Sequence, residues 1–251
     1  MINEFFRQGK SFVFDGKSSL DFFCVAAQGN TYNIAEIDYN TYSIVGRNGD
    51  MYTSNKRLNN IDIEIDCFIA GDNFFHHFFN LMAWLMSRKG YCDFCVASQP
   101  DYVRQAFFKG GTKPTVTNHG GSFTLTFSCD PRRFLTESRS IEKAGKKIFN
   151  GTLFDAKPRL FIPAASKGQT IKINSTVITI KEIQTQSSTD PEDWLCIDSE
   201  MMSCYKGGVN KNMAVGFNED SEDVFPILHP GTNKIETEIQ GLHIQKNFWT
   251  V

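Results

Sequence analysis

The sequence predicts a mainly β protein made of two bodies, and three observations lead to that prediction. Most of the 251 residues fall into short β-branched and aromatic stretches, separated by turn-forming pairs such as Asp-Gly and Asn-Gly. Only one stretch has the period of a substantial helix. The 23 phenylalanines suit the faces of sheets. We therefore expect an N-terminal β-sandwich or split barrel with one α-helix, followed by a C-terminal β-sandwich.

The predicted helix covers residues 72–89, with Asp72 as N-cap and Gly90 as the stop. At about 100° per residue its large apolar side chains fall on one arc of roughly 160°. They are Phe74, Phe75, Phe78, Phe79, Leu81, Met82, Leu85 and Met86. Trp84 lies near the polar side, without an obvious place in the core. It is a candidate interface contact, and the alternative is a tryptophan lying flat on its own domain.

The residues before and after this helix predict strands and turns. Residues 12–14 and 20–23 flank Asp15-Gly16, which predicts a hairpin with a tight turn. The segment 46–50, centred on Asn-Gly, predicts a second turn. Further strands of the first half are predicted at residues 32–45, 93–98, 102–108, 115–118 and 122–129.

Residues 61–67 have the clearest strand pattern, because apolar and acidic residues alternate with a period of two. The isoleucines face a core, and Asp62, Glu64 and Asp66 line the other face about 7 Å apart. Such carboxylates can bind a cation or take part in acid/base chemistry. The simpler interpretation is a solvated face.

A change of composition near Pro131 predicts a domain boundary. Residues 132–147 hold six basic side chains and lack strand periodicity. We expect a first domain of residues 1–135, a connector of residues 136–150 and a second domain of residues 151–251. Strands of the second domain are predicted at residues 159–162, 169–173, 177–183, 194–197, 202–205, 213–217, 234–239 and 242–246.

Composition argues against several classes of function. A net charge of −2 predicts no sequence-specific or general affinity for nucleic acid, and no apolar run reaches the ~20 residues of a membrane span. Seven cysteines and no leader-like first segment favour reduced thiols folded in a cytosol. Cys92 and Cys95 lack the second ligand pair of a zinc site. Gly16-Lys17-Ser18 lacks the earlier glycine of a phosphate-binding loop. We therefore expect no cofactor and no enzyme.

Seven short stretches occur in an order that resembles one known family. They are FVFDGKSSLDF at residues 12–22, GRNGD at 46–50, Trp84-Leu85, QPDY at 99–102, FSCDP at 127–131, CIDSE at 196–200 and FPILHPGTNKI at 225–235. Together they resemble the distal tail protein, Dit, of siphophages that infect Gram-positive bacteria. In the last stretch, Asn233 is expected to tie the turn through its side chain.

The resemblance implies a structural role in a virion. The first domain would form a ring at the phage tail tip, typically a hexamer, and the second would be a galectin-like β-sandwich outside it. The ring would join the tail tube to the tail-associated lysin or fibre, and in many relatives it also holds receptor-binding proteins. The chain would fold in the bacterial cytoplasm. Whether residues 247–251 return to the first domain stays open.

Candidate contact residues follow from this implied role. Asp62, Glu64 and Asp66 are candidates for a lumen face that repels DNA phosphates or for a subunit interface, together with Trp84, Arg47 and Asn48. Trp194 and Trp249 are candidate sugar or partner contacts, with a core position as the alternative. The alternative function is a carbohydrate-binding, lectin-like module for attachment to the host surface.

Overall fold

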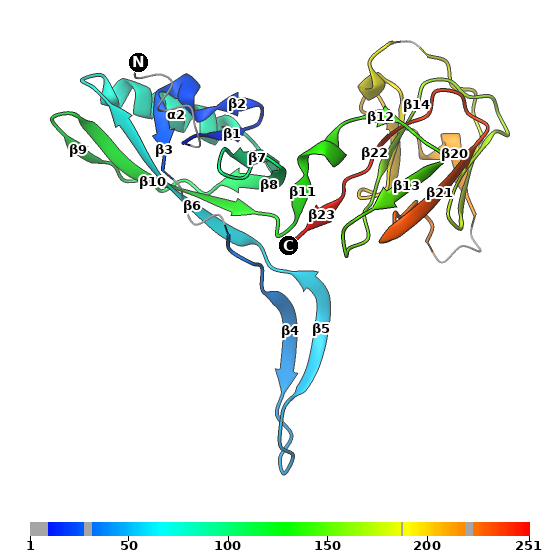
Figure 1. Cartoon of the computed structure of the whole chain (residues 1–251), viewed down its shortest axis with the longest axis horizontal. Helices are drawn as coiled ribbons and strands as arrows, with labels where there is room; N and C mark the ends of the chain where they lie inside the picture. Colours follow the sequence, from blue (N-terminus) through cyan, green and yellow to red (C-terminus); the bar gives the residue numbers. More distant parts are fainter. Residues whose placement is uncertain (1–9, 28–31, 187, 219–222) are drawn as a thin grey trace. The chain divides into compact units, whose positions relative to one another are not determined.

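The computed structural model describes residues 10–27, 32–186, 188–218 and 223–251 (Figure 1). The chain divides into two compact units. The first is Met1–Arg133 with Val251, and the second is Phe134–Thr250. Both are built mainly of antiparallel strands, and the described residues contain a single α-helix, so the predicted fold class is confirmed. Among the described residues, no helix combines the length and the hydrophobicity that a membrane span needs.

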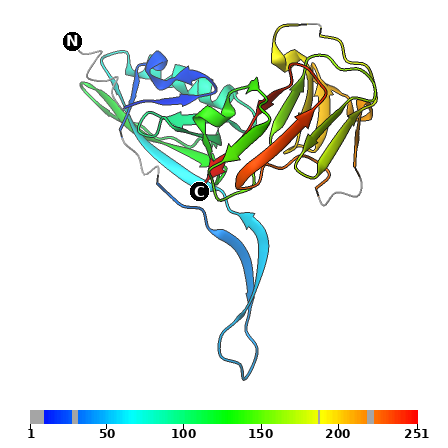
Figure 2. The same cartoon turned by 45° about the vertical axis from the view of Figure 1, so that its right-hand side comes forward.

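The body of the first unit is one antiparallel sheet in the order β2-β1-β7-β8-β10-β6-β3, with β9 on β10 (Figures 1 and 2). Its two long strands pair over ten residues each, from Gly120 opposite Ala70 to Cys129 opposite Ile61. The strands are β1 (Phe12–Phe14), β2 (Lys17–Ser18), β3 (Cys24–Ala26), β6 (Ile61–Ala70), β7 (Cys92–Val96), β8 (Tyr102–Phe108), β9 (Thr115–Thr117) and β10 (Gly120–Cys129).

Strand β6 has the predicted alternation and is three residues longer than expected. Every odd-numbered residue from Ile61 to Ile69 is buried and every even-numbered one is exposed. The buried residues form one core with Phe12, Phe14 and Phe127. This core fixes which face of the sheet is left to solvent.

Helix α2 (Phe74–Ser87) packs its buried side on this core. The helix is shorter than predicted: its N-cap is Asn73 instead of Asp72, and the backbone becomes extended at Arg88. The apolar arc is also narrower than predicted. Phe75, Phe79 and Met86 are 55%, 62% and 70% exposed, because a sheet beneath a helix covers only one side of it.

Trp84 corrects the interpretation of the helix faces. It is buried at 6% exposure, not placed on the polar side. Its ring stacks on Phe22 with centroids 4.5 Å apart and packs beside Phe12 and Phe14. The buried face runs through Phe74, Phe78, Leu81, Trp84 and Leu85. Trp84 thus belongs to the core.

The first hairpin is also different from the prediction. The Asp15-Gly16 turn is present, with positive φ of 48° and 74°. Its second strand, however, is only β2 (Lys17–Ser18), and Ser19–Phe22 form a 3-10 helix, η1, where a strand was predicted. The Ser18 hydroxyl accepts from Leu20 N, and Asp21 accepts from Ser18 N. This reciprocal capping favours a helical turn over an extended strand.

Strands β4 (Ile37–Tyr42) and β5 (Met51–Leu58) form a two-stranded sheet of their own (Figure 1). Its turn contains Gly46 and Gly49 at φ of 80° and 82°, as the Asn-Gly pattern predicts. Strand β5 was not expected from the sequence. The base of the hairpin is fixed because Asn59 N donates to Glu36 O at 2.9 Å.

The second unit is a β-sandwich. One sheet has the order β12-β22-β14-β17-β18-β19 and the other β13-β21-β15-β16-β20, and side chains of both, such as Leu160 and Ile171, share one core. The strands are β12 (Glu142–Lys143), β13 (Lys147–Asn150), β14 (Arg159–Ile162), β15 (Thr170–Ile173), β16 (Thr176–Ile180), β17 (Leu195–Asp198), β18 (Ser203–Lys206), β19 (Val209–Asn210), β20 (Val215–Phe217), β21 (Gly231–Thr237) and β22 (His243–Gln245).

The segment expected as a connector, residues 136–150, is largely regular structure of the second unit. It contains a 3-10 helix, η2 (Thr136–Arg139), followed by β12 and β13, and each of these strands is the edge of one sheet.

Two further 3-10 helices are η3 (Pro191–Asp193) and η4 (Asn212–Ala214). Because η4 occupies the start of the strand predicted at residues 213–217, strand β20 begins only at Val215. At the end of the chain, β11 (Arg133–Leu135) pairs with β23 (Trp249–Thr250). Val251 groups with the first unit, and its carbonyl accepts a hydrogen bond from Arg133.

Candidate assembly surfaces

The acidic residues of β6 form a row on the solvent face of the first unit. Asp62, Glu64 and Asp66 are exposed, and they stand opposite hydroxyl residues of β10. Asp62 pairs with Lys109 Nζ at 2.8 Å, and Asp66 accepts from Thr124 Oγ1 at 2.7 Å. Lys109 compensates one of the three charges, so the row keeps a negative balance.

The row has no metal-binding geometry. Among the residues that the structure describes, no group of three His, Cys, Asp or Glu side chains is placed to hold a metal. The row is therefore a surface of negative charge.

The β4–β5 hairpin exposes apolar side chains on a sheet that has no core. Seven large residues are at least 44% exposed, and Val45 at the tip is fully exposed; the others are Ile37, Tyr39, Tyr42, Ile44, Met51 and Tyr52. Tyr39 and Tyr52 touch each other, with ring centroids 5.2 Å apart. A lone two-stranded hairpin is at best marginally stable in water. Its exposed apolar surface therefore indicates a contact outside the chain.

The candidate contact residues Arg47 and Asn48 lie on this hairpin. Arg47 and Asn48 are exposed in its turn, and Arg47 N donates to Ile44 O at 3.1 Å. They belong to a different sheet from the acidic row, and Trp84 lies in the core. The structure thus brings together Asp62, Glu64 and Asp66, while the sequence pattern missed the hairpin tyrosines. Their signal in the sequence was composition, since Tyr39 and Tyr42 lie in the aromatic and β-branched stretch before the Asn-Gly turn.

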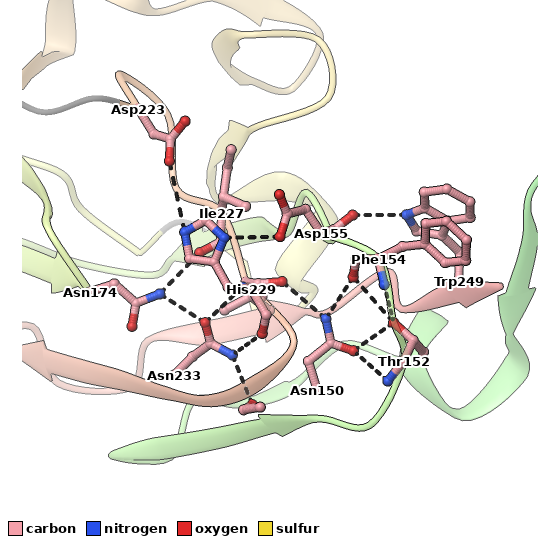
Figure 3. A network of polar contacts seen from close by, with 12 residues as sticks. Asn150, Thr152, Phe154, Asp155, Asn174, Asp223, Ile227, His229, Asn233 and Trp249 are labelled. Atoms are coloured by element: carbon pink, nitrogen blue, oxygen red, sulfur yellow. Dashed lines mark hydrogen bonds and ion pairs between the residues drawn. The ribbon is translucent and has the colours of Figure 1, made fainter. Parts of the chain in front are cut away.

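Trp194 and Trp249 are held by contacts of their own unit. Trp194 is 5% exposed, and its Nε1 donates to Ser188 O at 2.8 Å. Trp249 stacks on Phe154 with centroids 4.2 Å apart, and its Nε1 donates to Asp155 O at 2.9 Å (Figure 3). Trp194 therefore has no free ring face for a sugar, and one face of Trp249 is already covered.

A polar corner beside Trp249 fixes the turn before β21 (Figure 3). The buried Asn233 accepts from His229 N at 2.9 Å and from Asn174 Nδ2 at 2.8 Å, and its amide donates to His229 O at 2.8 Å. The prediction that Asn233 ties this turn is confirmed. His229 Nδ1 also lies 2.9 Å from Asp155 Oδ1. These contacts satisfy buried polar groups, so the corner is structural.

The cysteines are free thiols. Burial raises the pKa of the Cys92 and Cys95 thiols above the ordinary value, which lowers the fraction of reactive thiolate. Burial also raises the pKa of Cys129 and of Cys204 to about 12. A buried thiol with a raised pKa is a packing residue more than a nucleophile.

These features define a class of fold: a sheet with one covering helix and an isolated hairpin, followed by a β-sandwich. No family model and no curated protein matches the sequence. Among solved structures the chain is similar to the SPP1 Dit protein (gp 19.1), described as a paradigm of hub adsorption apparatus in Gram-positive infecting phages. The similarity has a TM-score of 0.63 at 14% identity, and it covers 93% of this chain and 96% of that one. The resemblance to Dit proteins is therefore confirmed in the fold.

Proposed function

We propose that this protein is a structural hub of a phage tail tip, present in the virion and assembled as a ring of identical chains. The Dit-like fold over nearly the whole chain supports this role. In this proposal the first unit forms the ring, typically a hexamer. The second unit is a galectin-like sandwich on its outside. The ring joins the tail tube to the tail-associated lysin or fibre and carries receptor-binding proteins for host attachment.

One observation carries the proposal of a ring: the β4–β5 hairpin. Its tyrosines, Val45 and Met51 are exposed to solvent and lack a core, and burial in a neighbouring copy removes this apolar surface from water. Such a contact joins two different patches, because a hairpin of one copy meets another surface of the next. Contacts of this head-to-tail kind close into a ring when the rotation from one copy to the next divides a full turn, and the Dit-like fold favours that outcome here.

The acidic row gives the ring a second property. DNA leaving the tail has to pass a hub without binding to it, and carboxylates repel phosphates. We assign Asp62, Glu64 and Asp66 to the lumen face of the ring. Arg47 and Asn48 lie at the hairpin tip and belong to the contact between copies.

The mass of the protein in solution tests the ring. Size-exclusion chromatography with light scattering measures this mass. We expect a value several times the 28.4 kDa of one chain, either for the protein alone or after it is mixed with the tail-tube protein of the same phage. Changing Tyr42 and Val45 to serine should leave the protein as a monomer.

The control changes two exposed methionines of the second unit, Met201 and Met213, to serine. This variant should keep the mass of the unmodified protein. A monomer under both conditions for the unmodified protein contradicts the ring, and a ring formed by the hairpin variant contradicts the role of the hairpin.

A further inference from the structure

Two lysines stand directly opposite each other on the outer face of the second unit. Lys147 of edge strand β13 pairs in register with Lys234 of β21. Ile235 N donates to Lys146 O at 2.9 Å, so the two lysines occupy a non-hydrogen-bonded pair, in which Cα atoms are about 4.5 Å apart. Neither has an ion pair within the described part of the chain. Like charges directly opposite on a sheet are destabilising.

The rest of this sheet face is also basic. Lys172 of β15 is exposed opposite Glu236 of β21. The stem of Lys181 lies across Gly216 of β20, where an added Cβ would meet Lys181 Cε at 2.5 Å. The four lysines therefore share one face with Glu236, although the whole chain has a net charge of −2. This separation of charge selects an anionic partner.

An apolar anchor and a groove adjoin the lysine pair. Phe149 is two residues from Lys147 on the same face of β13 and is 70% exposed. On the other side of Lys147, a groove of about 600 Å³ is lined by Lys143 and Lys146, by the acidic Glu236, and by Ile239 and Leu242 among others. Two lysines and one carboxylate thus line a groove that also has apolar side chains.

We propose that the Lys147–Lys234 pair, Phe149 and this groove form a binding surface for an acidic polypeptide segment of another protein. Carboxylates between the two lysines relieve their repulsion, and an apolar side chain of the segment covers Phe149. A polypeptide fits better than a phosphate polymer, because the surface has an exposed aromatic ring and its cations are lysines. Arginine is the residue that matches phosphate with paired hydrogen bonds. The inference does not depend on ring formation.

Stability of the full chain without a partner tests the repulsion. Lys234→Thr should move the urea midpoint of unfolding upward at low salt, and the gain should vanish at high salt, where the repulsion is screened. Lys172→Thr is the matched control on the same face. It removes a lysine that faces Glu236, so its midpoint should stay unchanged or fall. A lower midpoint for Lys234→Thr at low salt overturns the proposal.

Binding is tested with poly-L-glutamate as the probe, on the full chain at low salt. We expect it to raise the thermal midpoint of the unmodified protein and of Lys17→Thr, an exposed lysine of the first unit. The shift should be reduced severalfold in the double variant Lys147→Thr, Lys234→Thr, and also in Phe149→Ser. Equal shifts in all variants, or no shift at all, overturn the proposed surface. A larger shift with inorganic polyphosphate of matched length identifies a phosphate polymer and overturns the polypeptide.

Discussion

Trp84 lies on the side of helix α2 that meets the core. Its indole stacks on Phe22 and packs beside Phe12 and Phe14, so it joins the helix to η1 and β1 in one core. Aromatic pairs at these separations stabilise by about 0.5–1.5 kcal/mol beyond the burial of their area. The indole N–H has no hydrogen-bond partner in the described residues, so the contribution of Trp84 comes from packing.

This packing predicts a large effect of a single substitution. Trp84→Ala should lower the free energy of unfolding by about 3–5 kcal/mol, because it removes a buried ring and leaves a cavity. Phe75→Ala on the same helix is the control, since Phe75 is 55% exposed, and it should cost about 1 kcal/mol or less. Urea unfolding measures both, with far-UV circular dichroism of the backbone as the signal, because that signal does not require the tryptophan. Equal losses would contradict the burial of Trp84.

Strand β6 separates the two roles of the first unit by its alternation. Its isoleucines belong to the core, and its carboxylates form the acidic row on the opposite face. Surface charges of this kind contribute little to folding, as the exposed pair of Asp62 with Lys109 illustrates. The charge of the row can therefore change with little cost in stability, as the proposed lumen position requires.

This separation predicts that charge and stability can be changed independently. The triple variant Asp62→Asn, Glu64→Gln, Asp66→Asn should change the free energy of unfolding by less than about 1 kcal/mol. The assembled ring should then retain short double-stranded DNA at low salt, and salt should release it. A filter-binding measurement tests this. Neutralising Glu182 and Asp193 of the second unit is the control, and equal retention by that variant would contradict a lumen position for the row.

At the scale of the whole molecule, the proposed ring links stability to assembly. A hairpin that gains its apolar contacts only from another copy makes the folded state depend on oligomer formation. The thermal midpoint should therefore rise with protein concentration over about a hundredfold range. The hairpin variant with serine at 42 and 45 should lose this dependence. Differential scanning fluorimetry measures it. A midpoint independent of concentration, both for the unmodified protein alone and for its mixture with the tail-tube protein, would argue against assembly through the hairpin.

The sequence by itself determined the elements whose signal is local. Alternation in residues 61–67, the single helix expected over residues 72–89, the Asp15-Gly16 turn and the side-chain tie of Asn233 all depend on neighbours within a few positions. The order of short motifs carried the resemblance to Dit proteins, which the fold confirms.

Only the tertiary structure decided what depends on distant partners. The burial of Trp84 required η1 and β1 on the other side of the ring, and the facing of Lys147 with Lys234 required the register of strands 87 residues apart. The isolation of the β4–β5 hairpin is a property of the sheet order. The physical reason is that a side-chain pattern fixes which face of an element is apolar, whereas strand pairing and packing between remote segments fix what that face meets.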